Sequence, residues 1–149
     1  MARRDTEVMG LSLALAVAVL WAIPPICQKS LLDHLPRETI FALSTAVYAS
    51  AALMYCAWHR DAILASLPKV SARHGAVIVL YTVFGAFLAN ILFLHALRDN
   101  SSVVVTALAY TSPVFTLLLA ALVLRERISV RTVLGVVVVV FGVVLLVTA

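Results

Sequence analysis

The residues that could do acid–base or metal chemistry lie at the edges of the apolar segments of this sequence. Five long runs contain no Asp, Glu, Lys or Arg, so no carboxylate inside them could act as a general acid or base. His34, His59 and His74 lie in or beside the connections, and His95 precedes Arg98 by three residues. No two histidines have metal-ligand spacing on one helix. The sequence therefore predicts no enzyme, no metal site and no cofactor.

A different set of residues, inside the runs, suits the passage of a solute. A proline within a helix kinks it and frees the carbonyl four residues earlier, and at membrane depth such a carbonyl is tolerated only in protein contacts or in a wet cavity. Polar and aromatic groups accompany these prolines. The predicted pathway residues are Trp21, Pro24, Lys29, Tyr81, Asn90, Tyr110 and Pro113.

Two alternatives to this pathway stay open. Ser and Thr hydroxyls in helices often bond to their own backbone, and Tyr and Trp often form interfacial belts. Lys29 either meets an anionic substrate at the mouth of the first helix or extends its ammonium to the headgroup region.

Composition excludes a soluble protein. Of the 149 residues, 64% are hydrophobic and 12% are charged, against about 45–50% and about 25% in soluble domains. The net charge is +4, but the basic residues fall between apolar runs, so we expect contacts with lipid headgroups and not with nucleic acid. Cys27 and Cys56 form no CxxC pair and are expected to be free thiols. We predict an integral membrane protein.

Each uncharged run has the length of a membrane-spanning helix. The hydrocarbon core is about 30 Å thick, so a helix needs about 20 residues to cross it. The runs do not alternate as barrel strands do, which leaves helices as the way to satisfy the backbone in lipid. The predicted fold class is an all-α membrane bundle, one domain over residues 1–149. Its expected helices are 8–28, 39–58, 75–97, 100–124 and 130–149.

The basic residues predict the orientation. Cytoplasmic segments carry an excess of Lys and Arg. The N-terminus and the second and fourth connections carry Arg3, Arg4, Arg60, Lys69, Arg73, Arg125, Arg127 and Arg131. The first and third connections carry Lys29, Arg37 and Arg98. This bias of eight to three predicts a cytoplasmic N-terminus and an external C-terminus, in the plasma (inner) membrane.

The last predicted helix differs from the others in having almost no polar face. Gly135 and Gly142 are seven residues apart in a Val-rich run. Small residues let helix backbones approach each other in lipid. We predict that this helix faces lipid or forms dimer contacts through Gly135 and Gly142.

The order and spacing of several segments resemble the EamA-type drug/metabolite transporters. Residues 86–97 are similar to that family's "ly..Al" segment, and residues 106–116 resemble the helix that follows it and carries a proline at this place. Residues 124–128 resemble the "gErl" turn, and 135–143 the closing "G..li..Gv.l" pattern. Residues 20–29 resemble the first-helix pattern of Trp, a small residue and a terminal Lys.

The resemblance implies a five-helix module of a transporter. Members of this family usually carry two such modules, inverted relative to one another, with the substrate between them and transport by alternating access. A single module implies a pair, either a homodimer or an association with an inverted partner, that moves a metabolite or a drug-like solute. The alternative is a non-transporting membrane assembly subunit or a remnant module.

Overall fold

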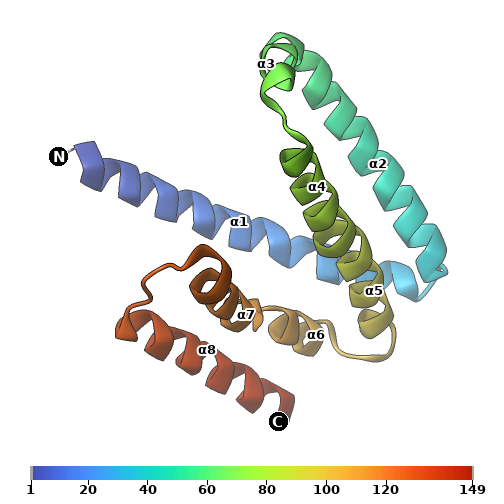
Figure 1. Cartoon of the computed structure of the whole chain (residues 1–149). Coiled ribbons are helices and arrows are strands. Elements are labelled where there is room, and N and C mark those ends of the chain that lie inside the picture. The colour runs from blue at the N-terminus through green and yellow to red at the C-terminus, as the bar shows by residue number, and fades with distance from the viewer. Residues whose placement is uncertain (1, 149) are drawn as a thin grey trace. The chain divides into compact units, whose positions relative to one another are not determined.

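The computed structural model describes residues 2–148, and this part of the chain is helical with no β-strand (Figure 1). The predicted all-α membrane fold class is confirmed, because five helical segments are long and apolar enough to cross a membrane. They are Met9–Leu32, Arg37–Trp58, Ala72–Asp99, Ser102–Leu124 and Val130–Thr148. Several extend past the predicted ends by a few residues, since charged end residues can stay helical while they reach the headgroup region.

The chain divides into two compact units, one up to Arg98 and one from Asp99. The first unit contains the helices of the first three spans: α1 (Ala2–Leu32), α2 (Arg37–Trp58), α3 (Arg60–Ser66), η1 (Leu67–Lys69), α4 (Ala72–Tyr81), η2 (Thr82–Leu88) and α5 (Ala89–Asp99). The second contains α6 (Ser102–Ala109), α7 (Ser112–Leu119), η3 (Ala120–Leu124) and α8 (Val130–Thr148).

In the first unit, the buried residues gather where α1, α2 and α5 meet. Pro25 of α1 is buried, as are Ile40 in the first turn of α2 and Leu94 and Leu97 in the last turns of α5. A tight turn joins α1 to α2, with the Leu35 amide donating to the Leu31 carbonyl over 2.8 Å. This end of the unit is therefore fixed by packing, and it positions the polar residues described below.

The connection between α2 and α4 is more ordered than the sequence indicated. It folds into the short helices α3 and η1 in place of an irregular loop. Ser71 then begins α4 with a capping box, in which the His74 amide donates to Ser71 Oγ and the Ser71 amide donates to His74 Nδ1. The His74 ring is thus part of a helix cap.

In the second unit, α8 packs against α6 and α7. Val105 of α6 and Val143 of α8 are buried there. The segment between η3 and α8 begins at Arg125, which has a left-handed backbone conformation with φ of 54°.

Most of the surface of each span is left uncovered by its own unit. At most 6% of the residues in the most apolar window of any of the five spans are buried. In water such apolar helices would aggregate, whereas in a bilayer the open faces contact lipid or further helices.

Candidate substrate pathway

The fourth span is broken at its centre. Pro113 lies 11 residues from Ser102 and 11 from Leu124, the two ends of that span. Here the sequence predicted a kink, and the structure has a complete interruption between α6 and α7 at Tyr110 and Thr111. Proline lacks the amide hydrogen that a continuous helix would need at this point. The α-helical bonding pattern is replaced by three-residue spacings, such as the Thr111 amide to the Leu108 carbonyl at 3.1 Å.

The side chains around this break divide into those used locally and one that is open. Thr111 Oγ1 donates to the Leu108 carbonyl over 2.7 Å, and Thr116 Oγ1 donates to the Ser112 carbonyl over 3.0 Å. These two hydroxyls therefore satisfy their own helices, as the alternative interpretation expected. Tyr110 caps α6 and is 40% exposed. Of the polar groups at the break, it is the aromatic one available to a solute.

The first span behaves differently around its prolines. α1 continues through Pro24 and Pro25 to Leu32 without interruption. Pro25 is buried and Pro24 is exposed. Trp21 is 62% exposed and lies 12 residues from Met9 and 11 from Leu32. That central depth does not fit an interfacial belt, because a belt residue would lie near one end of its span.

The third span contains a π-helical segment that the sequence did not indicate. η2 runs from Thr82 to Leu88. It lies between Tyr81, which is exposed, and Asn90, which is half-buried. π-Turns inside helices are often found at functional sites. The apolar pattern gave no signal for η2, because a π-turn needs no special residue type.

Lys29 links the first and third spans at the end where α1 stops. Its Nζ donates to the carbonyls of Leu97 and Arg98 at 2.8 and 3.0 Å. Those carbonyls belong to the last turn of α5, where the helix ends without partners of its own and carries partial negative charge. Lys29 therefore caps α5. Beside it, the buried Oε1 of Gln28 has no hydrogen-bond partner.

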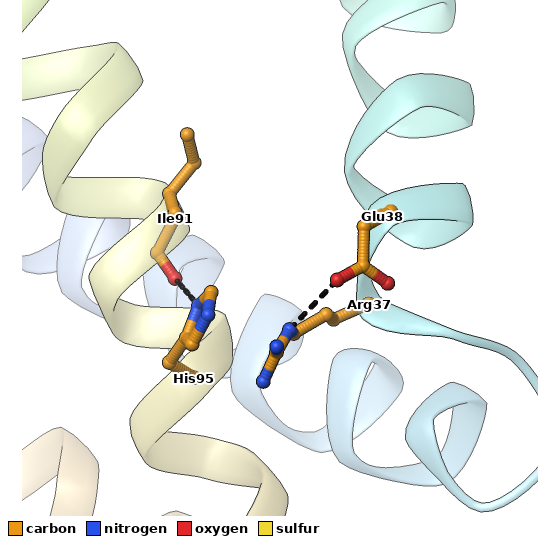
Figure 2. A network of polar contacts seen from close by, with 4 residues as sticks. All are labelled: Arg37, Glu38, Ile91 and His95. Carbon is orange, nitrogen blue, oxygen red and sulfur yellow. Dashed lines mark hydrogen bonds and ion pairs between the residues drawn. The ribbon is translucent and has the colours of Figure 1, made fainter.

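A polar network lies next to this cap (Figure 2). The Arg37 Nε donates to Glu38 Oε1 over 2.9 Å, and the pair is an ion pair at the start of α2. On α5, His95 Nδ1 donates to the Ile91 carbonyl over 2.8 Å. Figure 2 shows the Arg37 side chain extending from α2 toward His95. Charged groups from two helices thus gather at one end of the first unit.

The remaining predicted residues are placed as follows. Gly135 and Gly142 lie on α8, and within 4 Å of where a side chain would begin at either glycine there is no other atom of their unit. His59 stacks on Tyr55 with ring centroids 4.2 Å apart. Among the described residues, no group of three His, Cys, Asp or Glu side chains could hold a metal ion. Tyr110 and Pro113 belong to the second unit and the other pathway residues to the first, so their common pathway stays a prediction.

These features define a class of protein, an integral multi-pass helical membrane protein with a span interrupted at mid-depth. The EamA-like transporter family matches residues 8–148, so the chain belongs to that family. It is similar to an uncharacterized transporter from Archaeoglobus fulgidus, with 33% identity over 144 residues. That alignment covers 94% of this chain and 47% of the relative, so the chain spans about half the length of the curated relative it matches. No solved structure gives a significant match.

Proposed function

We propose that the chain is one half of a small-molecule transporter, a five-helix module that pairs with a second module and works by alternating access. The observation that carries the proposal is the break between α6 and α7 at the centre of the fourth span. Transporters bind substrates near the bilayer midplane on interrupted helices, because the freed backbone groups there need polar partners. Membership of the EamA-like transporter family supports the same function.

The need for a second module is supported by two further observations. The chain spans 47% of the length of its archaeal relative. The open face of α8 around Gly135 and Gly142 offers a surface on which another helix could pack closely. The second module is either another copy of this chain, giving a homodimer, or an inverted partner. The substrate is a metabolite or a drug-like solute that passes beside Trp21, Asn90 and Tyr110.

Uptake into proteoliposomes tests this function. The full chain is reconstituted, and the probes are ethidium and a set of radiolabelled amino acids. Tyr110→Ala and Asn90→Ala are expected to lower the uptake rate by roughly tenfold or more, since each removes a polar group in a low-dielectric pathway. The matched control is Tyr48→Ala on α2, which removes a tyrosine that is 76% exposed and should leave the rate unchanged.

The outcomes separate the site from the function. Wild-type rates in both variants, with a working wild-type protein, would contradict the assignment of these residues but not transport itself. An absence of flux for every probe, from correctly folded protein with and without a partner module, would favour a non-transporting assembly subunit. Circular dichroism and gel filtration of each variant show whether the fold is retained.

A further inference from the structure

A pocket of about 300 Å³ opens at the end of the first unit where α1 stops and α2 begins. The turn between these two helices forms one wall, and Arg98 of α5 forms another. Its polar lining is His34, Arg37, Glu38 and Arg98, and Leu32, Leu35 and Pro36 complete it. A space of this size holds a phosphate group with room for part of a larger molecule.

The pocket lies at the level of the lipid headgroups. It is bounded by Leu32 at the end of one span, Arg37 at the start of the next and Arg98 beside the end of a third. The Lys29 cap on the Leu97 and Arg98 carbonyls holds the end of α5 at this level. A pocket at the ends of three spans meets the region where lipid phosphates and dissolved anions are both present.

The hydrogen-bonding capacity of the two arginines exceeds its use. Arg37 contacts Glu38 through Nε, which leaves its terminal nitrogens for another acceptor. Among the described residues, no hydrogen bond or ion pair involves the side chain of Arg98, because its contact with Lys29 is through the backbone carbonyl. A guanidinium group presents N–H donors in a fork that matches phosphate and carboxylate oxygens.

We propose that this pocket binds a phosphate-type anion, held between the guanidinium groups of Arg98 and Arg37. The anion is either the headgroup of a phospholipid or a free phosphate from solution, since both present the same oxygens. Glu38 opposes the anion and occupies one donor of Arg37, so it keeps the affinity moderate. The site lies at the mouth of the unit and does not depend on whether the chain transports a solute.

The proposal is tested by binding to the full chain in detergent micelles with two probes. They are inorganic phosphate and dihexanoyl phosphatidic acid, with dihexanoylglycerol as a lipid that lacks the phosphate. Arg98→Gln keeps the carbonyl that Lys29 bonds, and it is expected to weaken binding roughly tenfold, as the loss of a charge-assisted hydrogen bond would. Glu38→Gln should have the opposite effect and tighten binding, because it removes a negative charge and releases Arg37.

Arg73→Gln is the matched control, since it removes one exposed positive charge from the same unit at the start of α4. It should change the dissociation constant less than about twofold, because an exposed charge remote from the site is screened by salt. Binding of both phosphate and phosphatidic acid supports a free-anion site, and binding of phosphatidic acid alone supports a headgroup site. The proposal is overturned if neither probe binds, or if Arg73→Gln weakens binding as much as Arg98→Gln. The Glu38→Gln variant keeps the test decisive if Arg98→Gln does not fold.

Discussion

At the scale of single residues, Arg125 shows how a backbone conformation can be set against a side chain. It is the non-glycine residue with positive φ among the described residues, at φ of 54° and ψ of 34°, and it ends the fourth span. A side chain in this region places Cβ close to the following carbonyl oxygen, which glycine avoids. The turn it forms satisfies a helix end, because the Glu126 amide donates to the Ala120 carbonyl over 3.1 Å.

Arg125→Gly is therefore expected to raise the free energy of unfolding by about 1 kcal/mol, the strain that glycine relieves in a left-handed position. The measurement is the midpoint of unfolding by sodium dodecyl sulfate in mixed micelles. Arg127→Gly is the control, because Arg127 lies in the same connection without positive φ, and it should be neutral or destabilising. A lower midpoint for Arg125→Gly would show that the arginine side chain stabilises the turn by more than the strain costs.

At the scale of elements, the sequence predicted where helices cross the membrane better than it predicted their interior geometry. The five spans follow from uncharged length alone. The interruption at Tyr110 was anticipated only as a kink at Pro113, while the similar Pro24 leaves α1 continuous. The π-helical η2 was not anticipated at all. A proline removes one hydrogen bond in each case, and the neighbouring packing decides whether the helix bends, breaks or continues.

The cap that Lys29 places on α5 gives a prediction at this scale. Lys29→Met keeps the apolar stem and removes both hydrogen bonds to the Leu97 and Arg98 carbonyls. The free energy of unfolding should fall by about 2 kcal/mol, since bonds to charged groups contribute about 1.5–3 kcal/mol and the freed carbonyls stay partly buried. Lys69→Met, which alters an exposed lysine in η1, is the control for loss of charge.

The same unfolding measurement in mixed micelles checks this prediction. Lys29→Arg should recover part of the stability, because a guanidinium group can reach the same carbonyls with different geometry. If Lys29→Met unfolds at the wild-type midpoint while remaining folded by circular dichroism, the ammonium group does not hold α1 to α5 in solution.

At the scale of the whole molecule, the charge distribution predicts one orientation in the membrane. Eight basic residues lie on the predicted cytoplasmic side and three on the other, as counted from the sequence. Five spans place the N- and C-termini on opposite sides. A homodimer of inverted copies would need both orientations, whereas a parallel dimer or an inverted partner protein needs one.

The expected result is that reporters fused to the C-terminus are active on the external face alone. Alkaline phosphatase and green fluorescent protein, which are active on opposite faces of a bacterial inner membrane, make the measurement. Arg127→Glu with Arg131→Glu is the control variant, because it reduces the bias of the fourth connection and should produce a mixed signal. A mixed signal from the wild-type chain would contradict the predicted orientation and favour the antiparallel homodimer.

The sequence by itself determined the membrane class, the five spans and the family resemblance, because each depends on local composition and spacing. It also marked Pro113 and Tyr110 as a point of irregularity. Only the tertiary structure decided that Lys29 bonds to α5, that Arg37 and Arg98 share one pocket and that Pro25 is buried while Trp21 is not. These contacts join residues up to 69 positions apart. In a chain this apolar, hydrophobicity drives every helix into lipid equally, so the choice of neighbours rests on a few polar bonds and close packing.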